Sequence, residues 1–373
     1  MRCWIEVSLG RIAANYDALR EAVNGEAEVM AVVKADAYRH GAVEVSRTLE
    51  GRGARWLAVS SVEEGVTLRD AGIGARILVM ADFLPGEREA MLANGLTPVI
   101  HTLSDVSAWE RMAEARGIER AAYHLKIDSG MGRLGTRAGS EEIAEVVRTA
   151  RRARLEGLMT HFASAANYES AQTEEQIARF EEIRRGLADA GIVPEFVHLA
   201  SSIPVAYARR EAWGKMVRPG HAVYGYVSPL VRGVGPAKLL KVSPALTWKA
   251  SIVAVKDLPA GARVGYGGMY RTLAPMRIGV LAAGYADGIP HRLSNRGRVI
   301  AGGKYAAILG AVSMDLTTID LTQAPQLEPG DAVTLLGEEG DARIDAQQIA
   351  RTAGTISYSV LCGISARVKR VYV

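Results

Sequence analysis

Short apolar runs rich in β-branched residues alternate with amphipathic helical segments through residues 1–225. Two of the helical segments are "AVEVSRTLEGRG" from Ala42 and "EEQIARFEEIRRGLADAG" from Glu174, and the second ends at Gly191, a suitable helix C-cap. The strand-like runs are "EVMAVVKA" from Glu28, "WLAVSS" from Trp56, "RILVMA" from Arg76, "TPVIHT" from Thr97, "YHLKID" from Tyr123, "LEGLMTHF" from Leu155, "FVHLASS" from Phe196 and "MVRPG" from Met216. Strands alternating with helices predict parallel β/α units, and eight such units close a barrel.

The pattern changes near Tyr226. Prolines and glycines typical of a linker gather there, at Pro229, Gly233, Gly235, Pro236 and Pro244. Beyond them lie short strand-like runs within "LTWKASIVAVKDLPAG", "MRIGVLAAGYADG", "GRVIAGGKYAAILGAV" and "DAVTLLGEE", with little helical pattern before about 344–353. We therefore predict an eight-stranded β/α barrel domain over residues 1–232 and a smaller, mainly β domain over residues 233–373.

Composition narrows the class of protein. The 373 residues are 49% hydrophobic, and the formal charge of +4 is spread without a block of like charges, so we predict no nucleic-acid partner. The two cysteines, Cys3 and Cys362, lie far apart, which excludes a disulfide framework and favours a reducing compartment. The opening residues lack a signal-peptide pattern, and no apolar run approaches the roughly 18 residues that cross a bilayer. We expect a cytoplasmic protein with no membrane partner.

Polar residues cluster where the predicted barrel strands end. They are Lys34, Lys126, His161, Ser202 and Arg218. Barrel enzymes build their sites at this face, often with a phosphate held by the loops after strands seven and eight. Lys34 follows the apolar run "MAVV", so its amine is expected to be partly desolvated and available as a nucleophile or base. The alternative is a lysine that extends its charge from a strand end into water.

The stretch Gly130-Met131-Gly132-Arg133-Leu134-Gly135 matches the dinucleotide-binding pattern G-x-G-x-x-G. A dinucleotide site also needs an acidic residue at the end of the next strand to hold the ribose. The next strand ends in "MTHF", which has no acid, and Arg133 stands where backbone should approach a pyrophosphate. The missing acid and the position of Arg133 therefore argue against a dinucleotide site, despite the match to the glycine pattern.

Eight blocks, in order and over nearly the whole chain, resemble alanine racemases. They are "AVVKADAYRHG" (31–41), "LKIDSGMGRLG" (125–135), "THFASA" (160–165), "VRPGHAVYG" (217–225), "VGYGGMY" (264–270), "GYADG" (284–288), "SMD" (313–315) and "ISYSVLCGISARV" (356–368). The resemblance implies a fold-type III pyridoxal-phosphate enzyme, with a β/α barrel followed by a β domain. It also implies a homodimer with shared active sites, a small-molecule substrate (L- or D-alanine), and a role in supplying D-alanine for peptidoglycan; no metal is called for.

The resemblance also implies the catalytic pair. Lys34 would bind pyridoxal 5′-phosphate covalently and act as one base, and Tyr266 would act as the second base on the partner's cofactor. Racemisation removes the α-proton from one face and returns a proton to the other, which two opposed bases can do. A phenol with a pKa of about 10 needs cationic neighbours to work as a base, and His161 and Arg218 match that role. On the residues alone, a core histidine and an ordinary turn tyrosine remain alternatives for His161 and Tyr266.

Further residues acquire roles only through the resemblance. The residues implied to hold the phosphate are Tyr38, Ser202, the backbone around Gly220 and His221, and Tyr358. Arg218 would face the pyridine nitrogen, and a guanidinium with a pKa above ~12 does not readily release its proton to it. The substrate would meet Arg133 at its carboxylate, Met314 through its backbone, and Tyr285 near the entrance. Lys126 matches a position that is carbamylated in many members of the family.

The chain departs from the family pattern at Asp36, Arg39, Ser201 and Ser313, and none of these removes a base. Two other readings stay open. One is a racemase of serine or another amino acid, or a decarboxylase, on the same fold, although Arg133 and Arg218 favour alanine racemisation. The other is a non-catalytic pyridoxal-phosphate carrier, a class that lacks the β domain.

Overall fold

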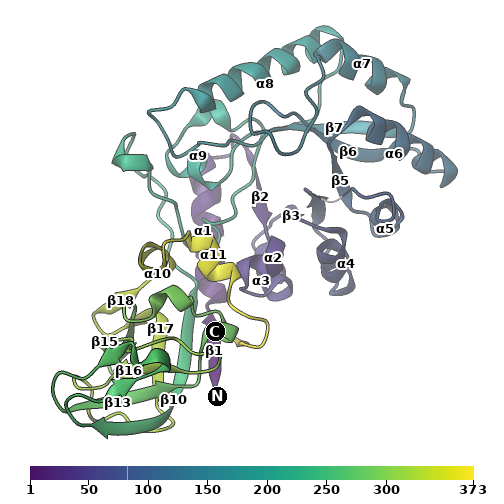
Figure 1. Ribbon diagram of the computed structural model, residues 1–373. Coiled ribbons are helices and arrows are strands. Elements are labelled where there is room, and N and C mark those ends of the chain that lie inside the picture. Colours follow the sequence, from purple (N-terminus) through teal and green to yellow (C-terminus); the bar gives the residue numbers. More distant parts are fainter. Residues whose placement is uncertain (82) are drawn as a thin grey trace. The chain divides into compact units, whose positions relative to one another are not determined.

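The computed structural model describes residues 1–81 and 83–373 (Figure 1). They form two compact units. The first, which we call the barrel unit, comprises Arg11–Ala37 and Ala42–Ser243. The second, the β unit, comprises Met1–Gly10, Tyr38–Gly41 and Pro244–Val373.

The barrel unit contains one parallel sheet built from the eight predicted strands. They are β2 (Glu28–Val32), β3 (Trp56–Val59), β4 (Arg76–Val79), β5 (Thr97–Ile100), β6 (Ala121–Lys126), β7 (Ala153–Met159), β8 (Phe196–His198) and β9 (Met216–Val217). Their order is β8-β7-β6-β5-β4-β3-β2-β9. Backbone bonds from Lys215 N to Val197 O (2.8 Å) and from Arg218 N to Ala200 O (2.9 Å) connect β8 to the segment around β9. The predicted barrel is therefore confirmed, as a nearly closed ring.

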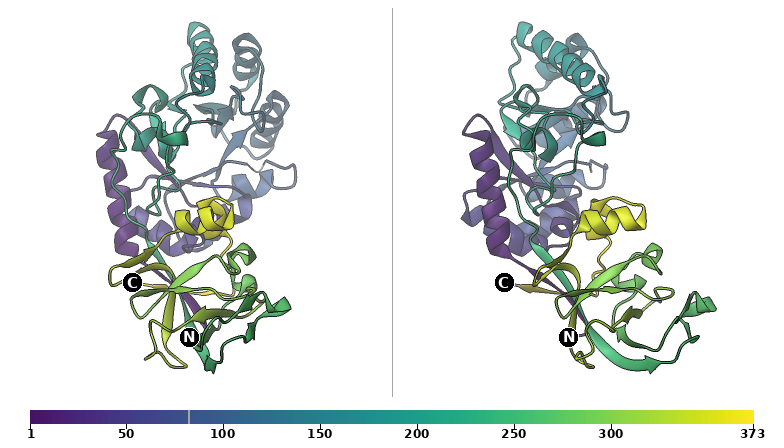
Figure 2. Two further views of the ribbon diagram at one scale, coloured as in Figure 1. Left: turned by 60° about the vertical axis from the view of Figure 1, so that its left-hand side comes forward. Right: turned by 90° about the vertical axis from the view of Figure 1, so that its left-hand side faces the viewer.

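Helices surround these strands (Figure 2). They are α1 (Leu9–Val23), α3 (Ala42–Gly51), α4 (Val62–Asp70), α5 (Arg88–Ala93), α6 (Leu103–Ala115), α7 (Ser140–Thr149), α8 (Gln172–Asp189) and α9 (Ser202–Ala206). Every residue of β3 and β5 is buried, as expected for parallel strands covered on both faces. Gly191 follows α8 with φ +79°, the left-handed conformation predicted for its C-cap glycine.

The β unit is organised around the long strand β10 (Leu246–Leu258), which pairs with β1 (Cys3–Val7), β13 (Met276–Leu281) and β17 (Ala332–Glu339). Its other elements are β11 (Arg263–Val264), β12 (Tyr270–Arg271), β14 (Arg298–Ala301), β15 (Lys304–Ala307), β16 (Thr317–Asp320), β18 (Ala342–Ile344), β19 (Lys369–Tyr372), α10 (Ala346–Ala353) and α11 (Ser357–Cys362). The sequence placed residues 1–10 with the barrel, but β1 pairs antiparallel with β10 and parallel with β19. The sequence of a five-residue strand does not indicate which of two sheets the strand will pair with.

Over residues 1–81 and 83–373, no helix is both long and apolar enough to span a membrane. In the same part of the chain, no group of three or more His, Cys, Asp or Glu side chains is arranged to hold a metal ion.

Candidate active site

Lys34 begins a left-handed helical turn, α2 (Lys34–Tyr38), just after β2. In this turn and the residue after it, five consecutive residues have positive φ, between +52° and +68°: Ala35, Asp36, Ala37, Tyr38 and Arg39. This conformation costs about 1–2 kcal/mol per L-residue, so other contacts must hold it. Ala35 N donates to Glu64 Oε1 at 2.6 Å, and Asp36 Oδ1 accepts from Ala42 N at 2.8 Å. An asparagine oxygen could accept the same bond, which accounts for the departure at Asp36. Strain kept by surrounding contacts marks a functional segment.

Cationic groups converge at the carboxyl ends of the barrel strands. Burial lowers the pKa of Lys126 to about 8, with further lowering by the charges of Arg218, Arg133 and Lys34. Burial also lowers the pKa of His161 to about 3, helped by Arg218 and Lys126. The structure thus brings these predicted residues together. His161 is a neutral hydrogen-bonding group at physiological pH rather than a cation, and the surplus of positive charge favours an anionic ligand.

The glycine-rich loop after β6 is organised by its own aspartate. Asp128 Oδ1 accepts from three backbone N–H groups, those of Gly130 (3.2 Å), Met131 (3.0 Å) and Gly132 (2.9 Å). Gly135, at φ +117°, lies where a Cβ would come within 2.7 Å of Asp128 N. The amides that would bind a pyrophosphate are therefore occupied, and the loop instead carries the exposed Arg133.

Ser202 joins the segments that follow β8 and β9. Its buried Oγ accepts from Gly220 N at 3.1 Å and from Ala222 N at 3.2 Å. The hydroxyl proton stays available to donate to a ligand. His221 is buried and stacks on Tyr226 with ring centroids 5.1 Å apart, so only its backbone suits the predicted phosphate site. These small groups lie at the position where barrels commonly bind phosphate.

Arg218 is buried, and five hydrogen bonds involve its two terminal nitrogens. Nη1 donates to His198 O (2.7 Å) and Nδ1 (3.0 Å). Nη2 donates to Thr160 O (2.7 Å) and Leu199 O (3.1 Å), with a longer contact to His161 Nδ1 (3.5 Å). Because a guanidinium has five N–H groups, only the Nε–H is left to donate elsewhere. Burial lowers the pKa of Arg218 to about 9, so the group stays charged at neutral pH.

Five of the predicted site residues lie in the β unit, and three of them are strongly exposed. The side chains of Tyr266, Tyr285 and Met314 are 76%, 45% and 54% exposed, which leaves them available to another molecule. Tyr38 and Tyr358 lie together, with ring centroids 6.1 Å apart. Burial raises the pKa of the Tyr38 phenol, with a smaller contribution from Tyr358, so the hydroxyl stays protonated and can donate a hydrogen bond.

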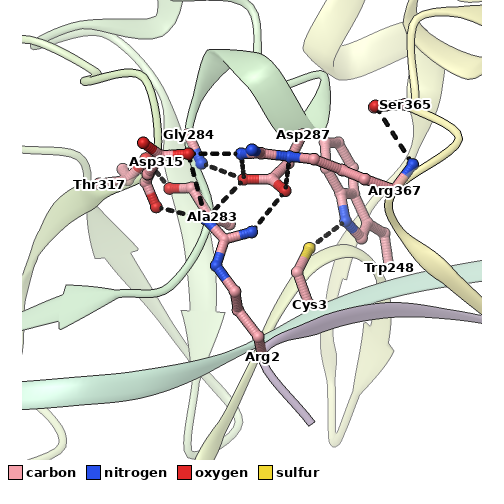
Figure 3. Close-up of polar contacts among 10 residues, drawn as sticks. All are labelled: Arg2, Cys3, Trp248, Ala283, Gly284, Asp287, Asp315, Thr317, Ser365 and Arg367. Carbon is pink, nitrogen blue, oxygen red and sulfur yellow. Dashed lines mark hydrogen bonds and ion pairs between the residues drawn. The ribbon is translucent and has the colours of Figure 1, made fainter.

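A buried carboxylate shapes the two loops that carry Tyr285 and Met314 (Figure 3). Asp287 accepts from Arg2 Nη1 and Arg367 Nε, both at 2.8 Å, and from Gly284 N at 2.8 Å. Burial alone would raise the pKa of Asp287, but the bonds from Arg367 and Arg2 lower it. The stabilisation is therefore present at neutral pH and is lost as the pH falls through this lowered pKa.

Close backbone packing joins the same two loops. A Cβ on Gly284 would lie 2.2 Å from Ser313 O, so only glycine fits there. Arg367 Nη2 also donates to Asp315 Oδ1 at 2.8 Å, which ties the second loop to the Asp287 network. The sequence contained Asp287 in the block "GYADG" but offered no sign that Arg2 and Arg367 would meet it.

The geometry defines a class of protein: a β/α barrel with a strained turn after Lys34 and a cluster of cationic side chains at the carboxyl ends of its strands. Residues 7–229 match the family model of the alanine racemase N-terminal domain, and residues 245–372 match that of the C-terminal domain. The chain belongs to the alanine racemase family.

Individual alanine racemases are similar to this chain over nearly their full lengths. Alanine racemases of Symbiobacterium thermophilum and Halothermothrix orenii are 42% and 38% identical, over 99% of this chain and 96% of each relative. The solved alanine racemase of Streptomyces coelicolor superposes with a TM-score of 0.93 at 34% identity, over 100% of this chain and 98% of that one. That of Bartonella henselae, with covalently bound pyridoxal phosphate, gives 0.87 at 25% identity over 100% of both chains.

Proposed function

We propose that this protein interconverts L-alanine and D-alanine with pyridoxal 5′-phosphate, using Lys34 and Tyr266 as opposed bases. The observation that carries the proposal is the strained turn that begins at Lys34, at the same face as the buried cations Lys126 and Arg218. Membership of the family supports the reaction. The implied biological role is the supply of D-alanine for peptidoglycan, in the cytoplasm.

The residues present fit the cofactor. Lys34 would bind it covalently, Ser202 and the backbone at Gly220 would hold its phosphate together with Tyr38 and Tyr358, and Arg218 Nε–H would donate to its ring nitrogen. The Ser202 hydroxyl supports this assignment, because its Oγ accepts from Gly220 N and Ala222 N and its own proton stays available for an anionic ligand. The pKa of Lys126, lowered by burial and by the charges of Arg218 and Arg133, indicates positive charge at the same face. When bound, the cofactor supplies the electron withdrawal that makes the α-proton of an amino acid acidic.

The protein's own groups then handle the proton and the substrate. Lys34 takes or returns the α-proton on one face, and Tyr266 from the partner subunit serves the other face. Arg133 holds the substrate carboxylate, with the Met314 backbone beside it and Tyr285 near the entrance. A homodimer is supported by the exposure of Tyr266 and of apolar side chains such as Leu273 (94%) in the β unit.

Lys126 is proposed to be carbamylated. Formation of a carbamate requires a neutral amine, and the lowered pKa of Lys126, about 8, makes that form accessible near neutral pH. A carbamate would replace a cation with an anion among Arg133, Arg218 and Lys34. The change would relieve the charge repulsion that, together with the larger effect of burial, lowers the pKa of Lys126, and it would orient Arg133.

The direct test is exchange of the α-hydrogen in deuterated water against a panel of amino acids, followed by chiral analysis. We expect exchange with inversion for both alanine enantiomers and much less for serine. Cofactor binding without turnover of either enantiomer would instead support a carrier. A preference for serine would support the related racemase.

Substitution Arg218→Glu is expected to slow racemisation by about 10²-fold and to raise the share of transamination. A carboxylate would favour a protonated ring nitrogen, which strengthens electron withdrawal and prolongs the reactive state, so protonation at the wrong carbon competes better. The ratio of keto acid to inverted alanine measures the effect and does not depend on the fraction of folded protein. Arg179→Glu, on the exposed face of α8, is the control. An unchanged ratio would contradict the role of Arg218.

A further inference from the structure

A file of polar side chains runs through the interior of the barrel unit, away from Arg218. His198, His124 and Glu156 are 0%, 0% and 3% exposed. Barrel interiors are normally filled with branched apolar side chains, and burying polar groups is costly unless they are paired. This file therefore needs a reason beyond packing.

The distances define an ordered chain of contacts. Arg218 Nη1 lies 3.0 Å from His198 Nδ1, and His198 Nε2 lies 2.8 Å from His124 Nδ1. His124 Nε2 then lies 3.4 Å from Glu156 Oε2, an ion-pair distance that is longer than an ordinary hydrogen bond. Arg76 closes the far end, with Nη1 and Nη2 at 3.1 and 2.7 Å from the two Glu156 oxygens.

Donor and acceptor chemistry allows one arrangement of protons along this file. Arginine can only donate, so His198 Nδ1 must accept and its proton must sit on Nε2. His198 Nε2–H then donates to His124 Nδ1, which puts the proton of His124 on Nε2, facing Glu156. Burial lowers the pKa of both histidines, so each is neutral and holds one proton. Both hydrogen bonds in the file therefore point from Arg218 toward His124, and the His124 Nε2–H faces the Glu156 carboxylate across 3.4 Å.

The strand around Glu156 is shaped for this contact. The pairing of β6 with β7 shifts between Tyr123 and His124, whose partners are Leu155 and Gly157, so Glu156 occupies a bulge. Bulges redirect side chains, which accounts for an acid that points into the barrel. Gly157 is also required, because a Cβ there would lie 2.5 Å from the His124 ring.

Glu156 is the anionic end of the file. Burial alone would raise its pKa, but interactions with His124 and Arg76 lower the pKa to about 2. Arg76, whose side chain is 43% exposed, lies over the Trp56 ring and leads to solvent at the amino end of β4. The carboxylate is thus charged and held from both sides.

We infer that Glu156 is a positioning residue for the racemase reaction: through the fixed proton positions of His124 and His198 it orients the Arg218 guanidinium, so that the Nε–H points to the cofactor site. This inference rests on the proposed function in one respect, the placement of Arg218 at the pyridine nitrogen. Glu156 touches neither substrate nor cofactor and acts only through the two histidines.

Neutron diffraction from deuterium-exchanged crystals of the cofactor-loaded protein tests the proton positions directly. We expect deuterium on Nε2 of His198 and of His124, and none on either Nδ1. Deuterium on either Nδ1, or a doubly protonated ring, would overturn the inference. This measurement needs no variant and does not depend on which amino acid is the substrate.

A double-mutant cycle tests whether Glu156 acts through Arg218. Glu156→Gln should lower kcat for alanine racemisation by about tenfold, leave KM within about twofold, and raise the share of transamination. In an Arg218→Lys background the same substitution should change these quantities by less than about twofold, because the group that it orients is gone. Glu156→Asp, which keeps the charge, should recover part of the loss.

Glu119→Gln is the matched control, because this carboxylate also pairs with an arginine, Arg152, but is 84% exposed. The inference is overturned if the effects of Glu156→Gln and Arg218→Lys multiply, or if Glu156→Gln alters only thermal stability while the product ratio stays the same. The two proposals fail separately. A protein that racemises no amino acid refutes the proposed function, whereas normal racemisation with the wrong histidine protonation refutes only the positioning role.

Discussion

Lys34→Ala is expected to abolish both covalent cofactor binding and racemisation, with kcat/KM falling by about 10⁴-fold or more. Lys34 begins the left-handed turn at the end of β2, and it is the side chain proposed both to hold the cofactor and to move the proton on one face. Two functions are therefore lost in one substitution. Borohydride treatment followed by peptide mass measurement detects the covalent link, and α-hydrogen exchange detects the chemistry.

The control for this prediction is Lys215→Ala, because Lys215 has an exposed side chain just before β9 in the same unit. It should retain covalent cofactor and near-normal exchange. Partial rescue of Lys34→Ala by an added primary amine would show that the loss is chemical rather than structural. Undiminished racemisation by Lys34→Ala, or a borohydride-fixed cofactor on another lysine, would contradict the assignment.

Tyr266→Phe is expected to reduce racemisation by about 10²- to 10⁴-fold in both directions. The two enantiomers have equal free energy, so loss of one base must slow the forward and reverse reactions by the same factor. Lys34 still reaches the proton on its own face. One enantiomer should therefore continue to exchange its α-hydrogen with solvent while keeping its configuration, and the other should not exchange.

Exchange of only one enantiomer would distinguish loss of a single base from a general loss of activity. Chiral separation followed by mass measurement of each alanine enantiomer in deuterated water gives both rates at once. Tyr270→Phe is the control, since its hydroxyl lies in the same loop region and contacts Met276 Sδ at 3.9 Å. Equal exchange of both enantiomers by Tyr266→Phe would remove Tyr266 from the mechanism.

Several features of the site follow from local sequence. Lys34, Lys126 and Arg218 could be assigned to one face because parallel strands of a barrel end at the same side. The eight strands were predicted because apolar β-branched runs alternate with helical segments along the first 225 residues. The resemblance in ordered blocks then identified the family, which both domain models confirm.

Other features depend on residues far apart in the chain. In the Asp287 network, Arg2 and Arg367 both donate to the same carboxylate, and no local sequence pattern predicts that these two arginines meet there. The use of the glycine-rich amides by Asp128 depends on how one loop folds back on itself. The left-handed turn after Lys34 contradicts local propensity, since alanine and tyrosine rarely adopt positive φ, and only surrounding contacts can hold it.

By itself, the sequence determined the barrel, the β domain that follows it, the family, and the identity of the groups expected to carry the chemistry. These depend on periodicity and on residue type, which are local properties. Only the tertiary structure decided which groups are charged, which donors remain available, and where β1 pairs. The neutral state of His161, the remaining Nε–H of Arg218 and the histidine file to Glu156 arise from burial and from contacts between strands, because those contacts exist only once the chain has closed into a ring.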